Sequence, residues 1–190
     1  MAEDLTKEDL SDGQMSLMDH LTELRSRLLL SIIIFIVLFV ICLVRIGDPS
    51  TSIADKVYLF LQKPLADLLA ERGGRMIFTG LHEGFFTQIK VAFFTSISIS
   101  LPIILMQVWK FVAPGLYKNE RNAMLPFMIA TPFLFILGAA MVYYMVIPLA
   151  WQFFLSFEIN PGQGALPIEV EPRISEYLSL VMRLMFAFGL

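Results

Sequence analysis

The 190-residue chain is far more apolar than an ordinary soluble domain: 57% of its residues are hydrophobic, 16% are charged, and its mean hydropathy is +0.72. Soluble globular domains carry charges on about a quarter of their residues, so this composition excludes that class and indicates a membrane protein. The net charge of −3 gives no basic excess, and we expect no nucleic-acid partner. The single cysteine, Cys42, excludes an internal disulfide framework.

Residues 1–17 form a polar, acidic tail, and we assign residues 18–190 to a transmembrane domain. Because the tail is acidic and no small-residue cleavage site follows the first apolar run, we expect that run to be retained as a span and not removed as a signal peptide.

Three uncharged runs are candidates for membrane helices: residues 28–44, 91–109 and 123–157. About 20 helical residues cross a hydrocarbon core of roughly 30 Å, so the first two runs predict one span each. The third is too long for one crossing and too short for two spans with a turn. We predict a single long helix that protrudes into water and bends at Pro126, Pro132 and Pro148.

A fourth apolar segment begins near Ile174 and stops at Leu190, too short to complete a crossing, so we expect the chain to be truncated there. The predicted fold class is therefore all-α, a polytopic transmembrane helix bundle with three complete spans and a truncated fourth. Arg183 lies inside that fourth segment. Charges within a membrane usually mark function, but an arginine near a helix end can reach the interface, and the sequence leaves both interpretations open.

The loop between the first two spans contains its own helical pattern over residues 53–69. Its apolar residues recur at three- and four-residue spacing, which predicts an amphipathic helix: Val57, Leu61, Leu65, Leu68 and Leu69. We expect Pro64 to bend this helix and Gly73 with Gly74 to end it. The helix is either a cap on the membrane surface or a surface on which a partner docks.

No pattern in the chain predicts an enzyme. His20 and His82 are far apart and lack the spacing of metal ligands, so we expect no metal and no cofactor. The serines of the second span, Ser96, Ser98 and Ser100, have no histidine or lysine on the same span to activate them. Close helix packing explains Ser96 and Ser100 better than a transport path does.

Lysine and arginine in the short flanks predict a cytoplasmic N-terminus. Basic residues precede the first span and fill the connection between the second and third: Lys7, Arg25, Arg27, Lys110, Lys118 and Arg121. Residues 158–176 hold four glutamates and only Arg173. The first loop weakens this pattern with six basic residues, but its length puts part of it beyond the reach of the rule.

In this orientation Glu23 and Glu120 flank the cytoplasmic ends of different spans. Carboxylates at an interface of lowered dielectric bind guanidinium groups through charge-assisted, often bidentate hydrogen bonds, so the pair is suited to hold two arginines of one ligand. The ordinary alternative is that Glu23 pairs with Arg27 four residues along its helix, and Glu120 with Lys118 or Arg121.

Four segments resemble, in order, the TatC subunit of the twin-arginine protein translocase: HLTELRSRLLL, LPIILMQVWKFVAPGLYKNER, the proline-broken span ending VIPLAWQFFLSF, and ISEYLSLVMRLMFAFG. The resemblance covers residues 18–190. It implies a six-helix protein of the bacterial inner membrane that binds twin-arginine signal peptides and exports folded proteins with the proton motive force. It also implies small single-span TatA/TatB-type partners and self-association in a receptor complex.

The resemblance assigns signal-peptide binding to Glu23 and Glu120, with Arg25, Lys118 and Arg121 in support and Pro64 and Phe111 as structural residues. The chain departs from the family because it stops before an acidic residue of the fourth span and before two further spans. The alternative function is a secondary transporter of a small solute, which would require polar or ionisable groups near the bilayer midplane. The first three predicted spans contain no charge.

Overall fold

The computed structural model describes residues 17–45, 51–70, 74–157 and 171–189. Over these ranges the chain is helical, which confirms the all-α prediction; the described residues contain no strand, and one isolated parallel bridge joins Ile77 to Arg173. The elements in chain order are α2 (Leu17–Leu43), α3 (Ile53–Ala70), α4 (Glu83–Val112), the 3-10 turn η1 (Ala113–Gly115), α5 (Lys118–Met141), the π-helical η2 (Val142–Val146), α6 (Ile147–Leu155) and α7 (Ile174–Gly189). The predicted tail and Gly73 lie outside the described residues, apart from Leu17.

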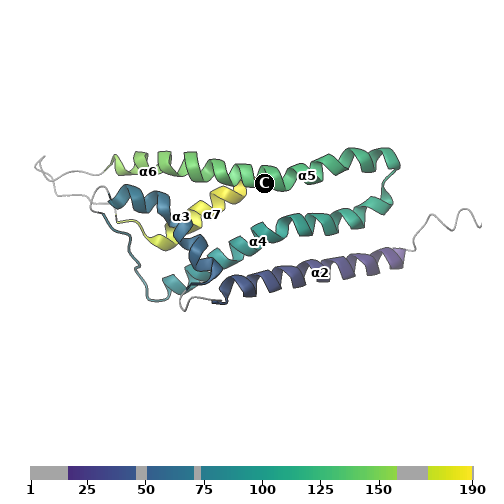
Figure 1. The fold of residues 1–190 in the computed structure, drawn as a ribbon, viewed down its shortest axis with the longest axis horizontal. Helices are drawn as coiled ribbons and strands as arrows, with labels where there is room; N and C mark the ends of the chain where they lie inside the picture. Colours follow the sequence, from purple (N-terminus) through teal and green to yellow (C-terminus); the bar gives the residue numbers. More distant parts are fainter. Residues whose placement is uncertain (1–16, 46–50, 71–73, 158–170, 190) are drawn as a thin grey trace, which may run out of the picture.

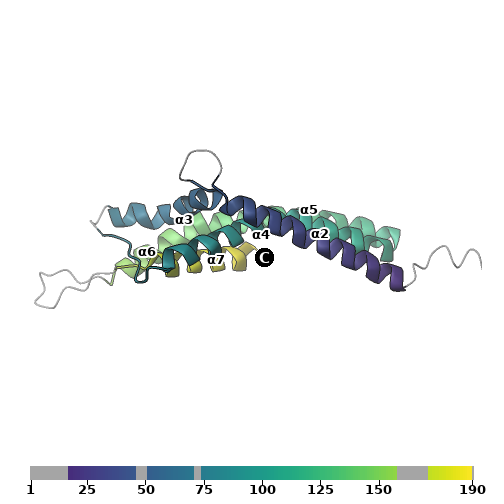
Figure 2. The same ribbon diagram turned by 90° about the horizontal axis from the view of Figure 1, so that it is seen from below.

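Three long helical rods run side by side along the molecule (Figures 1 and 2). One is α2, the second is α4, and the third is α5 continued through η2 into α6. The shorter α7 lies between α4 and the third rod, and α3 lies at the end opposite the start of α2. Three stretches are long and apolar enough to cross a membrane: Met18–Leu43, Glu83–Gly115 and Glu120–Leu155. They correspond to the three predicted spans.

The third span is one continuous helical rod, as predicted, and it continues through Pro126 and Pro132. Before Pro148 the helix widens into the π turn η2, in which the Ile147 N–H donates to the Val142 carbonyl five residues earlier. A proline cannot donate to the carbonyl four residues before it, and a π turn is one way in which a helix accommodates that loss. The sequence pattern did not predict this local widening.

The loop helix α3 buries Leu61, Leu65 and Leu69, one helical turn apart, which confirms the amphipathic prediction. These side chains join the principal core, where α3 meets α4, α6 and α7. After the helix, the Gly74 N–H donates to the Leu69 carbonyl at 2.9 Å, in agreement with a helix end at the predicted glycines. Because its apolar face is occupied by the chain's own helices, α3 caps the bundle.

Pro64 lies inside α3 and removes the hydrogen bond that the Phe60 carbonyl would otherwise accept from the residue four positions later. The structure replaces that donor from a distant part of the chain. The buried Tyr143 donates its hydroxyl to the Phe60 carbonyl at 2.9 Å, and the two rings stack with centroids 4.3 Å apart. The Tyr177 hydroxyl donates to the adjacent Leu61 carbonyl at 2.8 Å. Because Pro64 leaves the Phe60 carbonyl without its helical donor, this carbonyl is the acceptor through which Tyr143 joins η2 to α3.

Replacing Tyr143 with phenylalanine is expected to lower the free energy of unfolding by about 1–2 kcal/mol, because the Phe60 carbonyl loses its donor. Thermal unfolding in detergent measures this loss. In a Pro64→Ala background the backbone N–H at position 64 supplies the missing donor, so the same tyrosine substitution should cost much less. Tyr144→Phe is the matched control, because that side chain is 73% exposed. Equal losses from Tyr143→Phe in both backgrounds would contradict this role for Pro64.

Asp55 connects the ends of three helices near the start of α3. It accepts hydrogen bonds from the Ser52 backbone N–H at 2.7 Å and hydroxyl at 2.9 Å, and another from the Gln88 amide of α4. The Arg45 guanidinium, just after α2, lies 4.0 Å away. Burial acts to raise the pKa of Asp55, but these hydrogen bonds and the arginine charge together hold it below its ordinary value. The ionised Asp55 carboxylate therefore links the start of α3 to Gln88 of α4 and to Arg45, just after α2.

The packed core lies in the half of the molecule that contains α3 and α7, whereas much of the apolar surface of the long rods faces outward. In the most apolar window of α2 only 6% of the residues are buried. Exposed side chains such as Ile33, Val37, Phe127 and Ile136 would be unfavourable in water and are suited to lipid. The exposure pattern agrees with a multi-pass membrane protein.

Candidate functional site

The two glutamates singled out in the sequence lie at one end of the bundle. Glu23 is in the second turn of α2, and Glu120 is in the first turn of α5. Both views show that α2 and α5 begin at the same end, opposite α3, and that α4 ends there too (Figures 1 and 2). The antiparallel course of α4 and α5 therefore places at one end of the bundle two segments that lie about a hundred residues apart in the sequence.

Glu23 is held by Arg27 one turn along α2. The Arg27 Nε donates to Glu23 Oε1 at 2.9 Å, and a second guanidinium nitrogen contacts the same oxygen. This is the ordinary helix pair that the sequence offered as the alternative. The other oxygen, Oε2, is buried and has no hydrogen-bond partner among the described residues. With 19% of the side chain exposed, Glu23 is a partly desolvated carboxylate that satisfies only one of its two oxygens.

Glu120 occupies the third position of α5, where it accepts a hydrogen bond from the Tyr117 backbone N–H at 3.3 Å. A carboxylate here fixes the start of the helix and interacts favourably with its dipole. The sequence alternative of an ion pair with Arg121 does not form, and the Lys118 side chain lies outside the described residues. Glu120 is exposed, so its second oxygen is accessible to a ligand from solvent.

Phe111 lies near the end of α4 and stacks on His20 of α2, with ring centroids 4.3 Å apart and an angle of 16° between the planes. The contact joins the two helices one turn from Glu23. His20 was considered in the sequence only as a metal ligand, and nothing in its spacing indicated this aromatic partner.

Of the supporting cations, Arg25 and Arg121 are exposed and make no ion pair with any described residue. The sequence indicated Arg27 only as an ordinary helix partner of Glu23. In the structure Arg27 is the arginine that contacts Glu23. Tyr117, 81% exposed beside Glu120, was not singled out either. Its position within the quoted YKNER motif was the available indication.

The hydroxyl residues of the second span are engaged within their own helix. Ser96 and Ser98 donate to the carbonyls four residues earlier at 2.6 and 2.8 Å, and Ser100 to the carbonyl three residues earlier at 3.1 Å. Ser96 and Ser100 are completely buried, which supports packing as their role.

The family model described as Sec-independent protein translocase protein (TatC) matches residues 19–190. Proteins named Sec-independent protein translocase protein TatC from Magnetococcus marinus, Rickettsia prowazekii and Escherichia coli are 44%, 42% and 41% identical over 92%, 92% and 91% of this chain. The chain spans 59%, 66% and 61% of the length of these relatives.

A crystal structure of the twin-arginine translocase receptor TatC superimposes with a TM-score of 0.68 at 33% sequence identity. The match covers 90% of this chain and 68% of the solved one. A second crystal structure of the same receptor, in DDM, gives the same TM-score at 32% identity. Together with the family model and the arrangement of the helices, these matches show that the chain belongs to the TatC family of Sec-independent protein translocase proteins.

Proposed function

We propose that this chain binds twin-arginine signal peptides at the end of the bundle where α2 and α5 begin, as part of a translocase that exports folded proteins with the proton motive force. Glu23 and Glu120 each take one guanidinium of the arginine pair. The observation that carries the proposal is the buried Glu23 Oε2, which lacks a partner beside an ion pair. A buried unsatisfied carboxylate oxygen is costly, and a guanidinium donor removes that cost.

The site has the chemistry that a pair of arginines requires. An arriving guanidinium competes with Arg27 for Glu23 Oε1. After a rotation of the Glu23 side chain it also donates to Oε2, so that the ion pair between Glu23 and Arg27 is replaced by one between Glu23 and the peptide. The second guanidinium reaches the exposed face of Glu120, whose other oxygen holds the start of α5. Arg25, Lys118 and Arg121, which the resemblance assigns as supporting residues, are neighbours of the two glutamates in the sequence.

The proposed orientation puts this end of the bundle in the cytoplasm of a bacterial inner-membrane protein, with α3 on the opposite side. The supporting observation is the basic flanks of the first three spans. TatA/TatB-type single-span subunits and further copies of this chain are the proposed protein partners, by membership of the family. The outward apolar faces of the long rods offer surface for such helices as well as for lipid.

A peptide comparison tests this function directly. Photocrosslinking of the detergent-solubilised chain should be efficient with a signal peptide that carries two adjacent arginines and at least tenfold weaker when both are lysine. Lysine keeps the charge but presents a point donor instead of a planar fork, so it cannot satisfy both oxygens of one carboxylate. Equal crosslinking of the two peptides would remove the basis for the proposal.

The alternative of a secondary transporter is not favoured by the structure. In the uncharged runs 28–44, 91–109 and 123–157, which form the three candidate spans, the serine and threonine hydroxyls donate to carbonyls of their own helices. A coupling site near the midplane would require such groups to face a shared cavity. Membership of a protein translocase family also points to transport of proteins rather than to an enzyme.

A further inference from the structure

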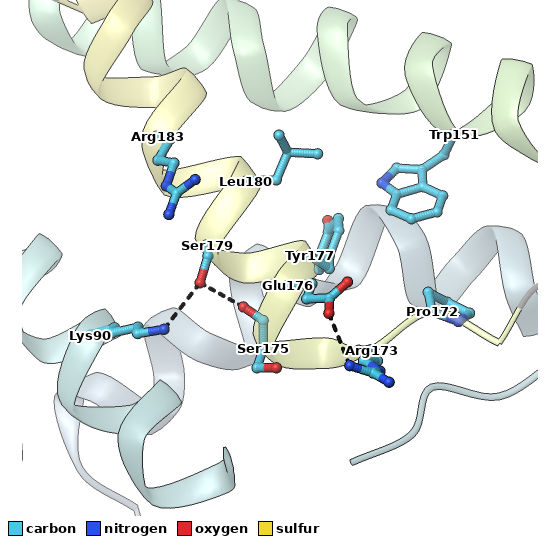
Figure 3. A pocket seen from close by; sticks show the side chains of 10 residues that line it. All are labelled: Lys90, Trp151, Pro172, Arg173, Ser175, Glu176, Tyr177, Ser179, Leu180 and Arg183. Atoms are coloured by element: carbon cyan, nitrogen blue, oxygen red, sulfur yellow. Dashed lines mark hydrogen bonds and ion pairs between the residues drawn. The ribbon is translucent and has the colours of Figure 1, made fainter. Parts of the chain in front are cut away.

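A groove between α4 and α7 contains a cationic site that the proposed signal-peptide function does not use. Two adjoining cavities, of about 540 and 370 Å³, share Lys90, Ser179 and Arg183 in their walls and so form one continuous groove. Figure 3 shows the Lys90 ammonium and the Arg183 guanidinium on either side of the Ser179 hydroxyl. Arg183, the unexplained charge of the fourth apolar segment, therefore lies beside a second cation from another helix.

The charges at this site are not balanced within the described part of the chain. The Lys90 Nζ donates to the Ser179 hydroxyl at 3.4 Å, and that hydroxyl donates to the Ser175 carbonyl at 2.6 Å. Neither Lys90 nor Arg183 forms an ion pair with any described carboxylate. Glu176 lines the same cavity, but it is paired with Arg173 at 3.2 Å. Two cations and one hydroxyl thus converge on a space whose carboxylate among the lining residues, that of Glu176, is already paired with Arg173.

The position along the helices places this space at the edge of the hydrocarbon region. Lys90 is the last charge before the uncharged run 91–109, and it lies on the candidate span Glu83–Gly115, whose 33 residues extend about 50 Å and exceed the core thickness. Arg183 has a long stem that lets its head reach the same level. Because α4 and α7 begin at the same end of the molecule (Figure 1), we place both charged groups near the depth of the lipid phosphates on that side of the membrane.

Beyond the cations the groove becomes apolar. Its second cavity is walled by Ile89, Phe93, Phe94, Met182 and Phe186, from the same two helices. Phe93 is 47% exposed, so this wall is open to the surroundings. A soluble anion would fill the cationic part alone, whereas a phospholipid fills both parts: its phosphate contacts the cations and an acyl chain lies against the aromatic and methionine side chains.

We propose that the α4–α7 groove binds an anionic phospholipid, with the headgroup phosphate held by Lys90, Arg183 and the Ser179 hydroxyl. The net positive charge selects an anionic headgroup over a zwitterionic one, because a choline or ethanolamine group would return a positive charge to the site. This lipid site lies at the opposite end of the bundle from Glu23 and Glu120, and it does not depend on signal-peptide binding.

Native mass spectrometry of the detergent-solubilised chain, titrated with phosphatidylglycerol or phosphatidylcholine, tests this proposal. Phosphatidylglycerol should bind more tightly, and Lys90→Gln and Arg183→Gln should each weaken the first binding step by about fivefold, the double variant by about 25-fold. Arg183→Lys retains the charge and should retain most of the affinity. Lys63→Gln is the matched control, because Lys63 is an exposed cation of α3 outside the groove and its loss should change nothing.

Three results would overturn the lipid site: unchanged phosphatidylglycerol affinity in the folded Lys90→Gln and Arg183→Gln variants, equal affinity for phosphatidylcholine, or displacement of the lipid by equimolar glycerol phosphate. Equal affinity for phosphatidylcholine would show that the groove binds lipid through its apolar wall alone. Displacement by glycerol phosphate would show that the site binds a free anion. If a glutamine variant does not fold, loss of affinity in a charge-reversed Lys90→Glu variant but not in Arg183→Lys decides the same question.

Discussion

Glu23→Gln is expected to weaken binding of a twin-arginine peptide by roughly 30-fold or more, the loss of about 2 kcal/mol that follows when one partner of a desolvated charge pair is removed. The Glu23 side chain is only 19% exposed, so solvent does not screen its charge as it does at a surface pair. Glutamine keeps the shape and one acceptor but loses the charge. The binding constant of a fluorescent signal peptide, measured in detergent, gives the change.

The structure supplies a control that separates recognition from local stability. Arg27→Gln removes the internal partner of Glu23 and frees both carboxylate oxygens, so peptide binding should be unchanged or tighter. If the pair only stabilises α2, Glu23→Gln and Arg27→Gln should weaken binding equally, and the assignment of Glu23 to the ligand would then be wrong.

Glu120 should have a smaller effect, because it is exposed. Glu120→Gln retains an acceptor for the Tyr117 N–H and so keeps the start of α5, while peptide binding falls by about fivefold for an exposed pair worth roughly 1 kcal/mol. Glu120→Ala should in addition lower the midpoint of thermal unfolding, since the helix start loses its cap.

Gly138→Ala is expected to destabilise the bundle by about 1–3 kcal/mol, because α5 and α7 touch through their backbones at this position. A methyl group on Gly138 would overlap the Phe188 carbonyl oxygen and lie 2.8 Å from the Gly189 Cα. Backbone atoms cannot move aside as a flexible side chain can, so the two helices must separate. Small residues at such crossings are a common way in which membrane helices approach closely.

Thermal unfolding in detergent measures this effect, and Gly84→Ala in α4 is the control. A methyl group on Gly84 would meet only the Phe78 ring at 3.8 Å, an ordinary contact, and alanine favours a helix over glycine. Gly84→Ala should therefore leave the unfolding temperature unchanged or raise it slightly. An equally small change in Gly138→Ala would show that α5 and α7 are not in the close contact described.

The sequence predicted the helices better than their contacts. Hydrophobic runs and period-3.6 spacing predicted the three spans and α3, because these patterns depend on residues near one another in the chain. These patterns do not specify which distant residue donates to a carbonyl that lacks its helical partner, or which distant backbone packs against a glycine. The use of Tyr143 to satisfy the carbonyl left open by Pro64, and the contact of Gly138 with the end of α7, depend on pairs that are far apart in sequence.

At the candidate site, too, the sequence indicated individual residues but not their contacts with distant residues. Charge asymmetry and the family motifs indicated Glu23 and Glu120, and the fold places their helix starts at one end. The stacking of His20 on Phe111 had no local pattern to indicate it. Arg183 remained ambiguous in the sequence because its neighbour across the groove, Lys90, comes from a different helix.

The central claim is that Glu23 and Glu120 hold one pair of arginines. The most direct test is to determine on which side of the native membrane each glutamate lies. Single-cysteine variants Glu23→Cys, Glu120→Cys and Lys63→Cys, made in a Cys42→Ala background, are labelled with a membrane-impermeant maleimide in right-side-out and inside-out vesicles. Positions 23 and 120 should react only in inside-out vesicles, and position 63, on α3, only in right-side-out ones. Labelling of 23 and 120 from opposite sides of the membrane would contradict the account, because two carboxylates separated by a bilayer cannot hold one pair of arginines.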